Sequence, residues 1–135
     1  MPVCYLLDTN IAGYVIKGNY PGVRARLVRV PMAEVGISVI TEAELRFGVE
    51  RRPGSSRLGE AVEEFLLRVS ILPWDSEAAK SYATLRSSQE RSGEPIGNLD
   101  WMIAAHALAA RALLVTHDRV FQRVKHWKIE DWTKP

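Results

Sequence analysis

The apolar positions of this chain recur in two spacings that alternate from one end to the other. Short continuous apolar runs, typical of strands covered on both faces, occupy residues 3–7, 36–40, 69–72 and 113–116. Between them, apolar residues spaced three and four apart predict helices at residues 11–17, 21–30, 41–52, 57–68, 76–92 and 98–111. A turn at 93–97, a short helix near 119–124 and a small edge strand near Ile129 complete the pattern.

Turn-forming residues separate these predicted elements. Gly18 ends the first helix, Pro21 begins the second, and Pro53 with Gly54 closes the third. Strands that alternate with helices imply a mainly parallel central sheet with helices on both faces, a three-layer α/β/α fold. With 135 residues and no internal repeat or long linker, we expect a single domain over residues 1–135.

Composition narrows the class of protein. With 47% hydrophobic and 25% charged residues, the chain has the balance of a folded globular protein rather than a disordered one. No apolar run approaches the roughly 20 residues that span a bilayer, and the N-terminus lacks signal-peptide features, so we expect a cytoplasmic protein without a membrane partner. Cys4 is the only cysteine, which excludes an internal disulfide and a cysteine-rich zinc site. We expect Cys4 to be buried in the first strand.

The net charge is only +2, but the basic residues are grouped. One interpretation is solvated helix faces, and another is a set of phosphate contacts for a nucleic acid. Charge alone does not distinguish between these two interpretations. The three groups are Arg24, Arg26 and Arg29; Arg46, Arg51, Arg52 and Arg57; and Arg119, Arg123, Lys125 and Lys128.

Carboxylates follow the predicted strands. Asp8, Asp75 and Asp118 come after the first, third and fourth strands, and Glu44 falls in the first turn of the helix after the second. Asp100 lies in the first turn of the buried helix that precedes the fourth strand. Ligands of open α/β sheets bind beyond the carboxyl ends of the strands, where such side chains can converge.

Each of these acids also has a purely structural explanation. Carboxylates at a helix start stabilise the free N–H groups and the helix dipole by about 0.3–1 kcal/mol. Thr41 and Glu44 fit a capping box, Asn98 is a candidate cap for the following helix, and Asp75 with Ser76 resembles an ordinary cap.

Three acids adjoin the most apolar segments, namely Asp8, Asp100 and Asp118. Partly desolvated carboxylates repel one another unless a cation lies between them. A set of oxygen ligands suits Mg²⁺ or Mn²⁺ better than zinc. The sequence therefore predicts a metal site at this edge, with Asp75 set apart as a helix cap.

Four segments, "LLDTNI", "ISVITEAELRFGV", "PIGNLDWMIAAHALA" and "LLVTHDRVFQRV…IEDW", resemble in order and spacing the PIN-domain ribonucleases of the VapC toxin family. The resemblance covers essentially the whole chain, and the ordered set is far more specific than any one motif. It implies the α/β/α fold, RNA cleavage with Mg²⁺ or Mn²⁺, a VapB antitoxin, a homodimer and a toxin–antitoxin hetero-oligomer. The residues of these four segments are most similar to those of the enteric VapC branch, which cleaves initiator tRNA in the anticodon stem-loop and so inhibits translation.

By motif match, the resemblance assigns the catalytic acids to Asp8, Glu44, Asp100 and Asp118. It implies that Asp8 and Asp100 are the principal metal ligands and that the other two support them or orient water. Thr9, Asn10 and Thr116 stand beside these acids and are candidates to hydrogen-bond them.

Other functions stay open at this point. One is a non-catalytic RNA-binding or protein-interaction module on the same fold. Another is a phosphatase with Asp8 as nucleophile, although such sites usually have a second Asp where this chain has Asn10.

No H-E-x-x-H or Walker A motif occurs, and we expect His106 to pack in the core. His117, beside Asp118, is a weaker candidate for an RNA contact.

The segments Ile11–Val30 and Leu45–Leu67 carry many apolar and aromatic residues. Helices that flank a small sheet cannot bury all of them in one core. We expect an exposed groove for a partner helix, and the resemblance implies that the antitoxin lies there.

Overall fold

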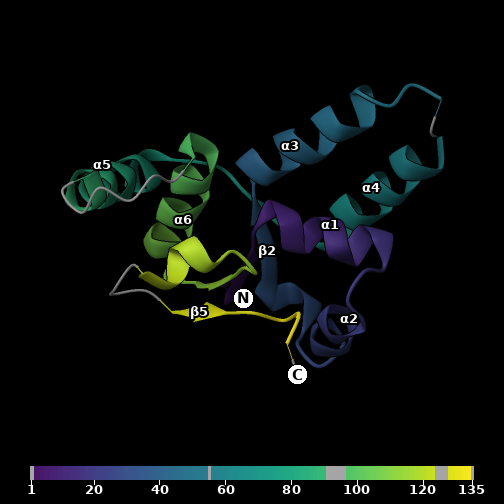
Figure 1. Ribbon diagram of the computed structural model, residues 1–135, viewed down its shortest axis with the longest axis horizontal. Coiled ribbons are helices and arrows are strands. Elements are labelled where there is room, and N and C mark those ends of the chain that lie inside the picture. Colours follow the sequence, from purple (N-terminus) through teal and green to yellow (C-terminus); the bar gives the residue numbers. More distant parts are fainter. Residues whose placement is uncertain (1, 55, 91–96, 124–127, 135) are drawn as a thin grey trace.

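The computed structural model describes residues 2–54, 56–90, 97–123 and 128–134. Its centre is a sheet of five strands in the order β3-β2-β1-β4-β5, and every neighbouring pair is parallel. This confirms the predicted parallel α/β sheet, including the edge strand near Ile129 (Figure 1). The strands are β1 Tyr5–Leu7, β2 Val35–Ser38, β3 Ser70–Leu72, β4 Leu113–Val115 and β5 Ile129–Glu130.

Helices connect the strands as predicted. Gly18, with φ 75°, ends the first of them, and Pro21 occupies the first turn of the second. That second helix ends at Leu27 rather than near residue 30. The expected end of the fifth helix at 91–92, and most of the turn at 93–97, lie outside the described residues. The helices are α1 Thr9–Lys17, α2 Pro21–Leu27, α3 Val39–Glu50, α4 Ser56–Arg68, α5 Ser76–Glu90 and α6 Asn98–Ala110, with short 3-10 turns at Met32–Glu34 and Arg119–Arg123.

Two neighbouring residues of β1 show how the layers form. Leu6 and Leu7 are both fully buried, and because side chains alternate along a strand they enter opposite faces of the sheet. Leu7 packs with apolar residues of α1, α2 and α4, whereas Leu6 packs with α5 and α6. Figure 1 shows these two groups of helices on opposite sides of β2. Burying each such side chain stabilises the fold by about 1.5–3 kcal/mol.

The second strand is shorter than predicted. It ends at Ser38, whose Oγ accepts a hydrogen bond of 3.1 Å from the Ile40 N–H and so caps α3. The helix therefore begins before Thr41, and the predicted capping box of Thr41 and Glu44 is wrong. Glu44 lies in the second turn of α3 and therefore does not cap this helix. Asn98 is likewise not a cap, because α6 begins at Asn98 with Gly97 as its N-cap.

The prediction of a buried Cys4 is also wrong. Cys4 precedes β1, and its side chain is exposed. Its backbone still continues the sheet, since its N–H donates to Glu34 O (2.8 Å) and its carbonyl accepts from Leu113 N (2.8 Å). No helix in the described part of the chain has both the length and the apolar character needed to cross a membrane.

Candidate active site

The four predicted acids lie at the carboxyl edge of the sheet. Asp8 follows β1, Asp118 follows β4, Asp100 is in the first turn of α6, and Glu44 is on α3. They lie near enough for their charges to interact, because Asp8 is affected by Asp100 and Asp118, and Asp100 by Asp118 and Glu44. The parallel topology thus produces the convergence that the strand-end pattern predicts.

Asp8 is the buried centre of this group, with 6% of its surface exposed. Burial raises the pKa of its carboxyl to about 6, against the hydrogen bonds from Thr116 and Ile11, and the charges of Asp100 and Asp118 add to the rise. Its Oδ1 accepts a hydrogen bond of 2.8 Å from the Ile11 N–H, so it is also the N-cap of α1. Asp8 therefore serves as a cap and as part of the acidic group.

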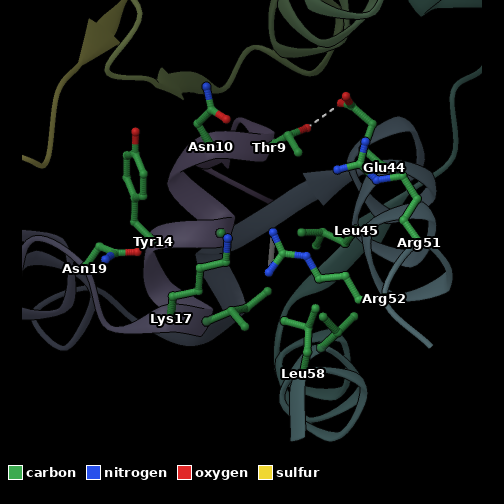
Figure 2. Close-up of a pocket in the computed structure, with 14 residues that line it drawn as sticks. Thr9, Asn10, Tyr14, Lys17, Asn19, Glu44, Leu45, Arg51, Arg52 and Leu58 are labelled. Carbon is green, nitrogen blue, oxygen red and sulfur yellow. Dashed lines mark hydrogen bonds between the residues drawn. The ribbon is translucent and has the colours of Figure 1, made fainter. Parts of the chain in front are cut away.

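Asp100 on α6 and Glu44 on α3 are the two members of the acidic group that are carried by helices. Burial raises the pKa of Asp100, and the charges of Asp118 and Glu44 raise it further. Thr9 donates a hydrogen bond of 2.6 Å from Oγ1 to Glu44 Oε1, drawn as the dashed line in Figure 2. This contact confirms Thr9 as a hydrogen-bond partner of one predicted acid. Asn10 is exposed and lines the neighbouring cleft.

Thr116 connects the remaining acid to Asp8. Its hydroxyl accepts a hydrogen bond of 3.1 Å from the Asp118 N–H, and its side chain also bonds to the Asp8 carboxylate. Asp118 is exposed, and its Oδ1 accepts from the Val120 N–H (3.0 Å). The edge of the group formed by Asp118 therefore faces solvent, where a substrate can reach it.

The acidic group carries no internal counter-charge among the described residues. No Lys or Arg of that part of the chain forms an ion pair with any of the four acids. Buried Asp8 and half-buried Asp100 have raised pKa values and no cationic partner among the described residues, and such a pair of carboxylates fits a bound divalent cation chemically. In the same described ranges, however, no three His, Cys, Asp or Glu side chains are arranged to hold a metal ion by themselves. A cation with only one or two carboxylate ligands, its other positions open to water and phosphate, is the usual pattern for Mg²⁺.

Sequence reasoning singled out His117 but missed its partners Asp131 and Thr133, with which it forms a second polar group. The Nδ1 of His117 lies 2.8 Å from Asp131 Oδ2 and 3.0 Å from Thr133 Oγ1. Although burial raises the pKa of Asp131, its hydrogen bonds with Thr133 and His117 lower it overall. The rings of Tyr14 and Tyr20 lie 6.5 Å and 5.7 Å from the His117 ring. Asp131 directly follows β5, so the strand-end pattern, extended to the last strand, would have found it.

His106 and Asp75 have structural roles, as predicted. His106 is 4% exposed, its Nδ1 lies 2.7 Å from Ser38 Oγ, and its side chain also forms a hydrogen bond with the Pro73 backbone. Burial lowers the pKa of its imidazole and so favours its neutral form. Asp75 Oδ1 accepts from the Ala78 N–H (3.0 Å) at the start of α5.

The predicted basic groups divide into paired and unpaired residues. Arg26 bonds to Glu130, Arg46 to Glu42 and Glu63, and Arg24 to the Val15 carbonyl. These three are structural rather than free. Lys125 lies outside the described residues.

Two hollows border the helices of the α1 side. One is a cleft of about 320 Å³ between α1, α3 and α4, which begins at Thr9 and Glu44 (Figure 2). The other, of about 620 Å³, lies between α1, α2 and α4 and is mainly apolar, with Val28 82% exposed on its border. The hollow between α1, α2 and α4 agrees with the exposed groove that the sequence predicts for a partner helix.

Comparisons with known proteins agree with this geometry. The PIN-domain family model matches residues 5–126. The tRNA(fMet)-specific endonuclease VapC of Shigella flexneri is 35% identical over 96% of this chain and 98% of its own length. Ribonuclease VapC1 of Haemophilus influenzae strain R2866 is 36% identical, with the same coverage.

Among solved structures, DNA-bound VapBC of Salmonella typhimurium matches with a TM-score of 0.89 and 34% identity over 96% of this chain and 98% of the matched chain. VapBC2 of Rickettsia felis, bound to a promoter DNA fragment, matches with a TM-score of 0.86 and 32% identity over 95% and 98% of the two chains. This chain therefore belongs to the PIN-domain family and, within it, to the VapC ribonucleases.

Proposed function

We propose that this chain is the metal-dependent endoribonuclease toxin of a VapBC-type toxin–antitoxin pair, working as a single PIN domain over residues 1–135 in the cytoplasm. The observation that carries the proposal is the group of four acids around buried Asp8, which has no cationic partner among the described residues. Relatives named as VapC endonucleases or ribonucleases match nearly the full chain, which supports an enzyme of the same kind.

In this proposal, Asp8 and Asp100 hold the cation, and Glu44 and Asp118 support them. The ion is Mg²⁺, with Mn²⁺ as an alternative, because oxygen ligands favour hard cations. When bound, the cation supplies positive charge to the scissile phosphate and lowers the pKa of a coordinated water.

The protein's own residues keep these acids in place. The Ile11 N–H and Thr116 hold the Asp8 carboxylate, which fixes its rotamer at the end of β1. Thr9 holds Glu44 in the same way. Because the donors belong to helix ends and a strand end rather than to a free loop, the acids are oriented before RNA binds.

For the substrate, we propose initiator tRNA, cut in its anticodon stem-loop, with arrest of translation as the consequence. The support is similarity to the Shigella and Salmonella enzymes named as tRNA(fMet)-specific endonucleases, each 35% identical to this chain.

For the partner, we propose a VapB-type antitoxin in the mainly apolar groove between α1, α2 and α4. Val28 and Met32 are exposed along this groove, and such apolar surface favours a partner helix. The matched Salmonella and Rickettsia structures are VapBC complexes, which supports this assembly. We propose a homodimer within the hetero-oligomer.

Incubation of the purified protein with total tRNA tests the proposed activity. With Mg²⁺ we expect a single cut species, and mapping its ends identifies the tRNA and the cleaved bond. With EDTA we expect no cut. RNA that stays intact in Mg²⁺ and in Mn²⁺, despite binding to the protein, would instead support a non-catalytic RNA-binding module.

A further inference from the structure

The cleft between α1, α3 and α4 joins the acidic group to a set of cations. Thr9 and Glu44 form one end of it, and Lys17, Arg51 and Arg52 line it further along. Lys17 is in the last turn of α1, and Arg51 and Arg52 follow the end of α3. Figure 2 shows Lys17 and Arg52 entering the cleft from these different elements.

These cations have no carboxylate partner in the described part of the chain. Arg46, Arg68 and Arg86 each form an ion pair with a glutamate, whereas none is formed there by Lys17 or Arg52. Arg51 stacks on the ring of Phe47, with its guanidinium 5.3 Å from the ring centroid. Its hydrogen-bonding N–H groups therefore stay available for another ligand.

A structural explanation covers only part of this arrangement. Cations at helix C-termini interact favourably with the dipole, by about 0.3–1 kcal/mol each. That accounts for Lys17 on α1 and for Arg51 at the end of α3. It does not account for a second arginine, or for cations of two helices meeting in one cleft, where their mutual repulsion is unfavourable. A bound anion removes that repulsion.

The cleft has the shape and chemistry for a phosphate with part of a nucleotide. Its volume, about 320 Å³, is at the lower end of the range of ligand pockets, about 300–1,000 Å³. Apolar side chains of Leu45, Leu58 and Val62 form part of its lining, and low-polarity walls strengthen the field of the cations. Guanidinium groups bind phosphate through two parallel hydrogen bonds.

We propose that Lys17 and Arg52, with Arg51 beside them, bind a backbone phosphate of the RNA substrate outside the scissile bond. This inference rests on the proposed function, because it assigns the RNA path leading away from the acidic group. The cations act as positioning residues: they hold the strand in the cleft that begins at Glu44, so that the scissile phosphate, further along the strand, lies at the acidic group. An RNA phosphate is favoured over an acidic protein segment because Glu44, one of the four proposed catalytic acids, lines the same cleft.

The test measures binding of fluorescently labelled tRNA(fMet) transcript by anisotropy, as a function of salt. All proteins carry Asp100→Asn, so that RNA is not cut. The double variant Lys17→Gln/Arg52→Gln is expected to bind at least about tenfold more weakly than its parent at moderate salt. The slope of log K against log salt should become less negative by about 0.7, the value for one lost phosphate contact on a single strand.

A matched control separates this cleft from general charge. Arg111→Gln/Lys134→Gln also removes one Arg and one Lys, both exposed, neither lining the cleft and neither in one of the three basic groups. Its slope should stay close to that of the parent. Lys17→Arg combined with Arg52→Lys keeps both charges and should restore most of the binding. Equal slopes for the two Gln double variants would overturn the proposal, as would unchanged affinity of the cleft variant.

The outcome also distinguishes this proposal from the proposed function. In an otherwise unmutated background, the cleft variant should cut tRNA with a raised KM and a kcat within a few-fold of the unmutated enzyme, as expected for a positioning role. If the unmutated protein cuts no RNA and its Asp100→Asn form binds none, the proposed function itself fails. If cutting and binding are normal but the cleft variant changes neither, only the cleft assignment fails, and an acidic segment of a protein partner becomes the alternative ligand.

Discussion

Thr9 Oγ1 donates a hydrogen bond of 2.6 Å to Glu44 Oε1, which joins the first residue of α1 to the second turn of α3. Thr9 also lies 3.1 Å from the hydroxyl of buried Thr41, so the three polar groups form a short chain. Because Thr9 follows Asp8 directly, the position of Glu44 is tied to the position of the buried acid. The two acids are therefore oriented together.

Replacing Thr9 with Val keeps the shape of the side chain but removes the hydroxyl. We expect RNA cleavage to fall by about tenfold, since a hydrogen bond to a charged group contributes about 1.5–3 kcal/mol. Thr9→Ser keeps the hydroxyl and should retain most of the activity. Single-turnover cleavage of tRNA measures both variants. Equal rates for Val and Ser would show that Glu44 does not need this contact.

Asp8→Asn should stabilise the metal-free protein at neutral pH. The folded pKa of Asp8, about 6, lies above the value of about 3.9 expected in the unfolded chain. The ionised carboxylate therefore costs stability above pH 6, by up to about 3 kcal/mol for this shift. Asn removes that cost and remains a good helix cap.

Urea unfolding in EDTA measures this effect. The Asn variant should be more stable at pH 8, the difference should shrink as pH falls from 6 to 4, and it should vanish below about pH 4, where Asp8 is protonated in both states. Added Mg²⁺ should raise the stability of the unmutated protein only. A variant that is less stable than the unmutated protein at pH 8 would contradict this account of the acidic group.

Ser38→Ala should destabilise the fold by about 2 kcal/mol, because it removes the cap of α3 and leaves the Nδ1 of buried His106 without its partner. Ser88→Ala, on the exposed face of α5, is the control and should change stability by less than about 0.5 kcal/mol. Thermal or urea unfolding compares the two. Equal stabilities would mean that the contact between Ser38 and His106 is not important for the core.

Val28→Asp tests the proposed antitoxin groove. Val28 is 82% exposed, so the charge should leave the stability of the free protein nearly unchanged. In the complex it would be buried against an apolar partner, and we expect binding of the co-expressed antitoxin to weaken by at least about tenfold. Isothermal titration with the purified antitoxin measures the loss, and Leu67→Asp, at an equally exposed residue that does not line this groove, provides a comparison. Unchanged affinity for Val28→Asp would place the antitoxin elsewhere.

The sequence predicts the architecture well because alternating apolar runs dictate a parallel sheet. The same pattern places Asp8 and Asp118 correctly, since a residue that follows a parallel strand must lie at the carboxyl edge. Element boundaries are less predictable. Ser38 ends β2 and caps α3 earlier than the apolar run suggests, so Glu44 moves from a predicted cap position into the second turn. Cys4 lies just outside β1, where an apolar run does not imply burial.

Contacts between distant segments could not be predicted from one chain. The pairs Thr9–Glu44 and His117–Asp131 depend on how helices and strand ends meet in space. The cations of the cleft belong to helices that sequence spacing does not connect. Periodicity indicates which face of an element is buried, but it carries no information on which exposed polar side chains become neighbours.

The central claim is that the four acids form a metal-dependent nuclease site. The most direct test compares Asp100→Asn with Asp75→Asn, which changes an equivalent carboxylate that only caps α5. In Mg²⁺, we predict that Asp75→Asn cuts tRNA like the unmutated protein and that Asp100→Asn loses at least about 10²-fold in rate while staying folded. Full cleavage by folded Asp100→Asn, or equal losses in both variants, would contradict the claim.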